Sequence, residues 1–272
     1  MGINKIKRTI IAIPARENSS RLPKKVIQDI KGKPMLIRVL EQCKKVKIPS
    51  KLILCTDSQL LCDLAKSIGV KSYITNKSCK SGSERIASVI KELINNAWED
   101  FVSNIHLTNH DKLMQTLIIN VQADQPFIDP NILEKMYNFF LAQDDTPEVV
   151  TPIYKLNEKD IHNNSVVKTL INQNGKVIYF SRAPLPFIRD IDKEYWHKYY
   201  NYWGHVGIYG YRADILSNWF NYPSSDLEKS EKLEQLKLID SEVNISTFKV
   251  KGDFLSVDTI EDLSVARQWL KN

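Results

Sequence analysis

The sequence predicts an α/β protein with a doubly wound, mostly parallel sheet and an appended antiparallel hairpin. In the first half of the chain, apolar segments rich in β-branched residues alternate with amphipathic segments, which is the pattern of a parallel sheet covered by helices. In the second half, an Asn-Gly pair separates two apolar runs and indicates a β-hairpin. Nothing between these parts has the composition of a flexible linker, so we expect a single domain over residues 1–272.

The parallel part is expected to contain five strands and four helices. Pro34 suits the first turn of a helix, Gly69 suits a helix C-terminus, and Asp129-Pro130 suits a helix start. The strands are predicted at 9–15, 51–57, 70–75, 117–122 and 149–154, and the helices at 34–46, 59–68, 82–95 and 130–141.

The second half predicts a different arrangement. The hairpin strands are expected at 166–171 and 176–180, around Asn172-Gln173-Asn174-Gly175. Further elements are expected at 206–211 and 245–250 (strands) and at 214–220, 228–239 and 260–269 (helices). Residues 96–115 have a mixed composition with no clean periodicity and are predicted to be an insertion. His106 and His110 could in principle bind a metal, but no further ligand lies at useful spacing, so a surface loop is expected.

Composition excludes several classes of protein. With 272 residues, 43% hydrophobic and 26% charged, the chain is globular rather than disordered. It lacks the ~20 consecutive apolar residues of a membrane span and has no leader-like N-terminal segment, so we expect a cytoplasmic protein with no membrane partner. Its 38 basic and 32 acidic residues are interspersed, which argues against nucleic-acid binding. The four cysteines show no C-x-x-C spacing and are expected to be free thiols.

A basic loop follows the first predicted strand. The apolar run that begins at Ile10 breaks at Pro14, and the next residues include Arg16, Arg21, Lys24 and Lys25. In parallel sheets, ligands bind where strands end in loops, so this loop indicates an anionic ligand such as a phosphate chain. The alternative is an ordinary solvated basic loop.

Two carboxylates complete the candidate site. Asp124 follows the strand at 117–122, and Asp258 precedes the last helix. Carboxylates together with bound phosphates are a common way to hold Mg²⁺, while Lys and Arg neutralise the remaining phosphate charge. Asp124 could instead be a turn residue before Pro126, and Asp258 could be a helix cap. The sequence lacks G-x-x-x-x-G-K-[ST] and G-x-G-x-x-G, so the combination suggests phosphoryl or nucleotidyl transfer without either of these loops.

Several separated stretches of the chain occur together in one order. They are I-P-A-R-x-x-S-S-R-L-P-x-K (13–25), G-K-P-M (32–35), T-D (56–57), S-G-S-E-R (81–85), N-V-Q-A-D-Q-P (120–126), Y-F-S-R-A (179–183), H-V-G-I-Y-G-Y-R (205–212), L-E-Q-L (233–236) and V-D-T-I-E-D-L (257–263). Each stretch is short, but their joint occurrence in this order is specific. By these stretches the chain resembles, from residue 10 to 270, the 3-deoxy-manno-octulosonate cytidylyltransferase (CMP-KDO synthetase) family.

This resemblance implies an enzyme with a nucleotidyltransferase-like, Rossmann-type three-layer fold. It would transfer CMP from CTP to the anomeric C2 hydroxyl of an eight-carbon sugar acid, KDO, with Mg²⁺ as cofactor, and release pyrophosphate for surface-glycan (lipopolysaccharide-type) synthesis. It also implies a homodimer. Residues 1–155 would mainly bind CTP, and 156–272 would mainly bind the sugar acid and form the dimer, with an interface expected in the aromatic-rich stretch 179–211.

The resemblance also assigns roles to individual residues. Arg16, Arg21 and Lys25 match triphosphate-binding positions, and Asp124 and Asp258 match the metal ligands; Arg16, Lys25, Asp124 and Asp258 are the expected catalytic residues. The cytidine side would comprise Pro14, Ala15, Thr56, Asp57 and Ser83. The sugar-acid side would comprise Gln122, Arg182, His205, Glu234 and Gln235. For two of these, the residues alone leave a structural role open: Arg182 as a surface ion pair, and Glu234 in a solvated helix.

Four positions depart from the family pattern. Lys24 and Val26 replace Gly and Pro in the basic loop, and Ala123 and Gln125 replace Gly and Glu around Asp124. Relatives that act on the 8-amino analogue of KDO can carry Gln at the Gln125 position, so that analogue is a candidate substrate.

Three further functions stay open at this point. The chain could be a cytidylyltransferase for a sialic-acid-like nonulosonic acid, a nucleotide-sugar glycosyltransferase or a non-catalytic nucleotide-binding regulator. The Y-F-S-R-A and L-E-Q-L stretches favour KDO over a sialic acid. A glycosyltransferase would lack the basic loop, and a regulator would not require both Asp124 and Asp258.

Overall fold

The computed structural model describes residues 5–19, 21–101, 106–252 and 254–269, and the chain divides into two compact units. The first unit comprises Met1–Thr146, Gly210–Phe220 and Asp253–Asn272, and the second comprises Pro147–Tyr209 and Asn221–Gly252. Two late segments of the chain therefore belong to the first unit. The single-domain organisation and the functional division at residue 155 stay predictions.

The sheet of the first unit is built around β1 (Arg8–Ala15). β1 pairs in parallel with β4 (Lys51–Thr56) on one side and with β6 (Thr116–Asn120) on the other. β5 (Lys71–Ile74) continues the sheet beyond β4, and β11 (Tyr209–Arg212) lies beside β6. Every residue of β1 except Arg8 is buried, because helices cover both faces of a sheet of this kind. The strand is therefore apolar throughout rather than alternating.

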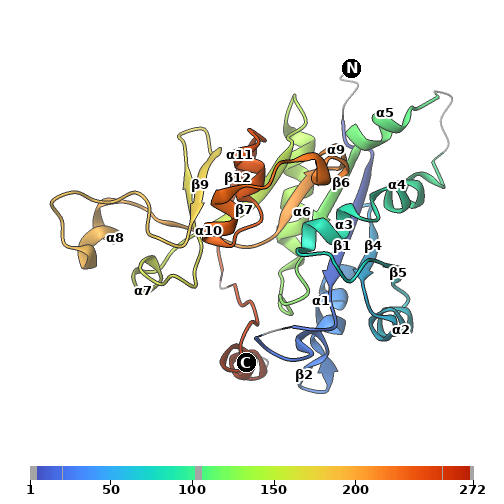
Figure 1. Cartoon of the computed structure of the whole chain (residues 1–272), viewed down its shortest axis with the longest axis horizontal. Helices are drawn as coiled ribbons and strands as arrows, with labels where there is room; N and C mark the ends of the chain where they lie inside the picture. Colours follow the sequence, from blue (N-terminus) through green and yellow to red (C-terminus); the bar gives the residue numbers. More distant parts are fainter. Residues whose placement is uncertain (1–4, 20, 102–105, 253, 270–272) are drawn as a thin grey trace. The chain divides into compact units, whose positions relative to one another are not determined.

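Most helices of this unit lie close to the sheet, whereas the last one packs with Leu22, Ile30 and Met35 (Figure 1). The helices are α1 (Met35–Lys44), α2 (Gln59–Ser67), α3 (Gly82–Ala87), α4 (Ile90–Trp98), α5 (Asn109–Met114), α6 (Pro130–Ala142), α9 (Ala213–Ser217) and α12 (Ile260–Trp269). The unit also contains a small antiparallel pair, β2 (Asp29–Ile30) and β3 (Lys33–Pro34). Short 3-10 turns lie at Lys25–Ile27 and Trp219–Asn221. The predicted strands and most predicted helices of the first half are thus confirmed.

Two expectations for the first unit were wrong. The predicted helix 82–95 is two helices, because α3 ends at Ser88, whose hydroxyl donates to the carbonyl of Arg85 at 2.7 Å, and a new helix begins at Ile90. The segment 96–115 is not simply a surface loop: Trp98 is buried and its Nε1 donates to Thr116 Oγ1 at 2.9 Å. Its later part forms α5, which starts with a capping box between Thr108 and Asp111; residues 102–105 lie outside the described residues.

The second unit is mainly antiparallel. Its strands follow the order β12 (Ile245–Val250), β7 (Val149–Lys155), β10 (Trp203–His205), β8 (Lys168–Ile171) and β9 (Val177–Ser181), with only the β12–β7 pair parallel. The predicted hairpin between β8 and β9 is confirmed. Asn172 Oδ1 accepts hydrogen bonds from the main-chain N–H groups of Asn174 and Lys176, and Gly175 adopts φ +73°.

Two predicted elements of the second half are interrupted. The strand expected at 206–211 begins only at Tyr209, as β11, because the chain passes through Gly207 at φ 85° after β10 has ended at His205. The helix expected at 228–239 breaks at Lys232, which adopts the left-handed φ of 53° between α10 (Asp226–Glu231) and α11 (Leu236–Asp240). Two further short helices, α7 (Glu158–Ile161) and α8 (Trp196–Tyr199), and a 3-10 turn at Lys193–Tyr195 belong to this unit.

Two expectations drawn from composition can be compared with the fold. All four cysteines are buried and free, as expected, and burial raises the pKa of Cys43 and of Cys55 to about 12. Within the described residues, none of the helices combines the length and the apolar character needed to cross a bilayer.

Candidate active site

A cavity of about 270 Å³ lies in the first unit, at the carboxyl ends of β1 and β6. Parallel strands place their C-terminal loops on the same edge of a sheet, and ligands bind at that edge. Among the residues predicted from the sequence, those that line the cavity are Pro14, Ala15, Arg16, Arg21, Lys25, Gln122, Asp124 and Asp258. The structure thus brings together segments that lie far apart in the sequence.

The basic loop after β1 is anchored in the protein. Leu22 and Val26 are buried, and Leu22 packs in a cluster with Met35, Val257 and Leu263. Because apolar side chains alternate with the cations, the loop is held in place while its charged side chains face the cavity. An ordinary solvated loop would lack this anchoring, so that description does not fit.

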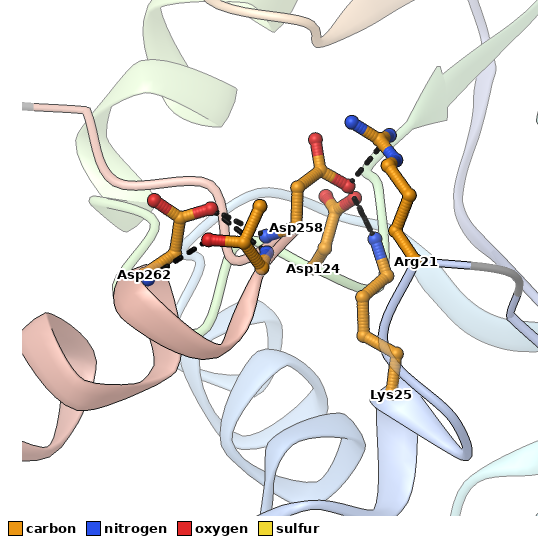
Figure 2. Close-up of polar contacts among 6 residues, drawn as sticks. Arg21, Lys25, Asp124, Asp258 and Asp262 are labelled. Atoms are coloured by element: carbon orange, nitrogen blue, oxygen red, sulfur yellow. Dashed lines mark hydrogen bonds and ion pairs between the residues drawn. The ribbon is translucent and has the colours of Figure 1, made fainter.

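Lys25 lies between the two predicted metal ligands (Figure 2). Its Nζ donates to Asp124 Oδ2 at 2.7 Å and to Asp258 Oδ1 at 2.9 Å. Arg21 Nη2 also donates to Asp258 Oδ1, at 3.0 Å. Burial lowers the pKa of Lys25, but pairing with Asp124 and Asp258 outweighs this effect and raises its pKa above the ordinary value. Lys25 is therefore an ammonium cation bridging two carboxylates.

The main chain keeps the two aspartates side by side. The N–H of Val257 donates to the carbonyl oxygen of Asp124 at 2.9 Å. At the start of α12, Asp262 Oδ2 accepts from the N–H groups of Asp258 and Thr259, and Thr259 Oγ1 accepts from the N–H of Asp262 (Figure 2). Thr259 and Asp262 thus cap the helix, which leaves the carboxylate of Asp258 to face Lys25.

The carboxylates of Asp124 and Asp258 supply only part of the oxygen ligands that a divalent cation such as Mg²⁺ needs. Two carboxylates converge on one point, yet within the described ranges no group of three or more His, Cys, Asp or Glu side chains could hold a metal. Mg²⁺ is commonly bound by one or two carboxylates, with water and substrate phosphates as its other ligands. The pair Asp124 and Asp258 fits an ion that arrives with a phosphate chain.

Three residues predicted for the cytidine side do not line this cavity. Thr56 is buried, and its Oγ1 accepts from the N–H of Ser58 at 3.3 Å. Asp57 is paired with Arg85, and Ser83 lies in a buried polar network. Their expected contact with cytidine stays a prediction.

Arg85 lines the cavity but was not predicted from the sequence, although it closes the S-G-S-E-R stretch. Its side chain is 3% exposed, and its Nη2 lies 3.1 Å from Asp57 Oδ2. Asp57 Oδ1 in turn accepts from the N–H of Glu17 at 3.2 Å, and Glu17 Oε2 accepts from Ser58 Oγ at 2.5 Å. Arg85 and Asp57 thereby tie α3 to the residue that follows Arg16.

A second network orients Gln122. Its Nε2 donates to Asn120 Oδ1 at 3.1 Å, Asn120 Nδ2 donates to Ser83 Oγ at 3.2 Å, and Ser83 Oγ lies 3.1 Å from the hydroxyl of Tyr211. A β-carbon on Gly82 would lie 3.1 Å from Gln122 Oε1 and 3.0 Å from Pro14. Glycine at this position therefore lets α3 approach the side chain of Gln122 closely.

The remaining residues predicted for the sugar acid belong to the second unit. Arg182 follows β9: its Nε donates to the carbonyl of Glu231 at 2.8 Å, and its own carbonyl accepts from Lys168 Nζ at 2.7 Å. It is thus held by main-chain contacts with the end of α10 rather than standing as a surface ion pair. Lys168 was not foreseen; it is buried and donates to three carbonyls, and burial, together with Arg182, lowers its pKa to about 8.

His205 ends β10 and is predominantly neutral at pH 7. Burial lowers its pKa to about 4, and its Nε2 shares a hydrogen bond with the hydroxyl of Tyr209. Glu234 and Gln235 lie in the turn between α10 and α11, so the alternative of a solvated helix for Glu234 does not hold, and its contact with a sugar acid stays a prediction. Gln235 is 3% exposed, and its Nε2 has no hydrogen-bond partner in the part of the chain that the structure describes.

The departures from the family pattern have structural consequences. Lys24, at the usual glycine position, adopts the left-handed φ of 52°. Ala123 is absent from the described positive-φ residues, as expected for a residue other than glycine. Gln125 is buried, and its main-chain N–H donates to the carbonyl of Gln122 at 3.3 Å.

The known proteins to which this chain is similar include cytidylyltransferases. The cytidylyltransferase family matches residues 10–245. The 3-deoxy-manno-octulosonate cytidylyltransferase of Chloroherpeton thalassium is 33% identical over 94% of this chain and 95% of its own length, and that of Francisella tularensis subsp. tularensis is 35% identical over 95% and 96%. A solved CMP:2-keto-3-deoxy-manno-octonic acid synthetase complexed with CTP superposes with a TM-score of 0.81 at 30% identity and covers 97% of this chain and 99% of its own. The chain therefore belongs to the cytidylyltransferase family and is an enzyme of its 3-deoxy-manno-octulosonate group.

Proposed function

We propose that this enzyme transfers CMP from CTP to the anomeric C2 hydroxyl of KDO and releases pyrophosphate, with the triphosphate bound in the cavity of the first unit. The observation that carries the proposal is the convergence of Lys25, Asp124 and Asp258 at the carboxyl ends of β1 and β6. The names of the relatives support the sugar acid, and the CTP complex of the similar structure supports the nucleotide.

The reaction needs little covalent chemistry from the protein. The C2 hydroxyl oxygen forms a bond to the α-phosphorus, the bond from that phosphorus to the bridging oxygen of the β-phosphate breaks, and the hydroxyl proton is released. Catalysis then rests on positioning and on neutralising charge that develops on the leaving pyrophosphate. Arg16, Arg21 and Lys25 line the cavity and supply that positive charge.

Asp124 and Asp258 would hold Mg²⁺ through their carboxylate oxygens. When bound, the ion would neutralise phosphate charge and polarise the phosphoryl oxygens. The capping box at Thr259 and Asp262 and the hydrogen bond between Val257 and Asp124 keep the two carboxylates at the cavity.

We propose that Arg182, His205, Glu234 and Gln235 bind the sugar acid. Arg182 supplies positive charge for a carboxylate, and a neutral His205 can accept a hydrogen bond from a sugar hydroxyl. Gln235 brings a buried amide whose Nε2 has no partner within the described residues, which is the state expected of a group that awaits a ligand. Arg182→Ala should then raise KM for the sugar acid more than it lowers kcat.

The sugar acid is KDO or its 8-amino analogue, and the neutral Gln125 is the feature that keeps the analogue in consideration. Pyrophosphate release should be measured with CTP, Mg²⁺ and, in separate reactions, KDO, the 8-amino analogue and N-acetylneuraminate. Release with the first or second acid supports the proposal, and the ratio of kcat/KM between them identifies the substrate. No release with either of them contradicts it, and release with N-acetylneuraminate alone would identify a sialic-acid enzyme instead.

The metal ligands are tested separately. Asp124→Asn and Asp258→Asn should each lower kcat by about 100-fold or more, because each removes a charged oxygen from the ion that neutralises the phosphates. Circular dichroism should show an unchanged fold. A variant that keeps wild-type activity across a Mg²⁺ titration would remove that aspartate from the metal site.

We also propose a homodimer formed through residues 179–211. The part of this stretch that belongs to the second unit exposes Phe187 (70%) and Tyr199 (63%). In Figure 1 the segment that carries α8 projects away from the strands of its unit. Analytical ultracentrifugation should find a dimer that Tyr199→Glu dissociates. Phe220→Glu, at a similarly exposed residue (60%) outside the stretch, is the matched control and should remain dimeric. A monomeric wild-type protein would refute this arrangement.

A further inference from the structure

Lys25 lies between the two carboxylates that are proposed above to hold the metal. Its Nζ is within 2.9 Å of both Asp124 Oδ2 and Asp258 Oδ1, and its side chain is 14% exposed, against 20% for Asp124 and 31% for Asp258. Arg21, by contrast, contacts only Asp258 of this pair, and its side chain is 67% exposed. Of these two cations, Lys25 bridges the pair (Figure 2), and its side chain is the less exposed of the two.

We propose that Lys25 is a positioning residue that holds Asp124 and Asp258 together before the metal binds, and that the metal then displaces its ammonium from the pair. The inference rests on the metal site proposed above. It assigns Lys25 two successive partners in one cavity: first the two carboxylates, and then the phosphates of CTP.

The electrostatics require a cation between these carboxylates. Two carboxylates held at one site repel each other, and a positive charge between them offsets that repulsion. Lys25 supplies that charge without a metal. Lys25 Nζ lies 2.7 Å from Asp124 Oδ2 and 2.9 Å from Asp258 Oδ1, so these two oxygens could hold Mg²⁺ only if the ammonium moved away. Binding of the ion therefore requires Lys25 to leave.

When CTP is bound in the cavity, its phosphates provide a second anionic partner for Lys25. The same cavity is lined by Arg16, Arg21, Lys80 and Arg85, so a triphosphate bound there lies within reach of the loop that carries Lys25. Without CTP, a metal that displaces Lys25 leaves its ammonium without an anionic partner, which weakens metal binding. When CTP is bound, its phosphates pair with the displaced ammonium, so the free energy lost by displacing Lys25 is recovered. Nucleotide and metal therefore each strengthen binding of the other.

The direct test is Mn²⁺ binding to the nucleotide-free enzyme, followed by electron paramagnetic resonance. Lys25→Met should bind Mn²⁺ about tenfold more tightly than wild type, within the usual range for coupling between sites. Lys24→Met makes the same charge change one residue earlier, at an exposed side chain, and should stay within about twofold of wild type. Equal affinity for the two variants, or weaker binding by Lys25→Met, would overturn the proposal.

A second measurement uses the intact wild-type protein, in case Lys25→Met folds poorly. Acetylation of individual lysines by acetic anhydride can be followed by mass spectrometry. Mg²⁺ should speed acetylation of Lys25 severalfold relative to Lys24, because the displaced amine becomes accessible. An unchanged ratio would contradict displacement.

Asp258→Asn separates this inference from the metal site on which it rests. If that variant binds Mn²⁺ as wild type does in the presence of CTP, the metal site itself is wrong. If it loses Mn²⁺ while Lys25→Met gains none, the metal site stands and only the exchange with Lys25 is wrong.

Discussion

The main-chain N–H of Val257 donates to the carbonyl oxygen of Asp124 at 2.9 Å, which joins the segment before α12 to the loop after β6. Val257 is fully buried and belongs to the same apolar cluster as Leu22 of the basic loop. One buried cluster and one hydrogen bond thus connect the three segments that supply Lys25, Asp124 and Asp258. The site depends on this buried junction as much as on the charged residues themselves.

The capping residue Asp262 should matter for both stability and metal binding. Asp262→Ala removes the acceptor for the N–H groups of Asp258 and Thr259, which should lower the free energy of unfolding by about 1 kcal/mol and raise the Mn²⁺ dissociation constant in the presence of CTP severalfold. Urea denaturation and Mn²⁺ titration measure the two effects. Glu261→Ala, which removes an exposed carboxylate in the same turn, is the control and should change neither quantity appreciably.

Neutralising Asp57 should be strongly destabilising. Asp57→Asn leaves the buried guanidinium of Arg85 without its counter-charge, and breaking a buried ion pair in this way costs about 3 kcal/mol. The unfolding free energy from urea denaturation tests this value. Asp63→Asn makes the same chemical change at an exposed position of α2 and should cost less than about 0.5 kcal/mol. Equal costs for the two variants would show that the pair with Arg85 adds no stability.

His205 should remain neutral throughout the neutral pH range. With its pKa lowered to about 4, its ring signals in an NMR titration should not move between pH 5.5 and pH 8. The unfolded chain takes up a proton on this residue near its ordinary pKa of about 6.5, so the stabilisation is present above that pH and is lost as the pH falls toward 4. His205→Gln should therefore reduce the loss of stability between pH 7 and pH 5. A titration midpoint near 6.5 in the folded protein would refute this.

Lys24 should be replaceable by glycine with a gain in stability. At φ 52° its β-carbon is strained by about 1 kcal/mol, which glycine avoids, while the greater freedom of glycine in the unfolded chain offsets part of the gain. We expect Lys24→Gly to raise the unfolding free energy by about 0.5 kcal/mol. Lys45→Gly, at an exposed lysine with φ −80°, has no such strain to relieve and should not stabilise. If Lys24→Gly destabilises as Lys45→Gly does, the loop holds Lys24 without strain.

The candidate site could be predicted only in part from the sequence. As expected, one cavity is lined by Arg16, Arg21, Lys25, Gln122, Asp124 and Asp258. Strand ends and matching motifs place these residues at one edge of a parallel sheet. The T-D and S-G-S-E-R stretches also match the family, but their Thr56, Asp57 and Ser83 do not line the cavity. A motif determines where the backbone lies and not the direction of each side chain. Arg85 was missed for the same reason: its burial and its pairing with Asp57 depend on how α3 packs against the end of β4.

The sequence by itself determined the elements whose causes are local. The apolar run of β1, the hairpin around Asn172 to Gly175 and the start of α6 at Pro130 follow from side-chain periodicity, turn chemistry and proline geometry, which operate over a few residues. Tertiary structure decided where helices break, as at Ser88 and Lys232, and which charges meet. Lys25 bridges Asp124 and Asp258 because a buried cluster and a single main-chain hydrogen bond bring distant segments together, and such long-range contacts leave no periodic signal in the sequence.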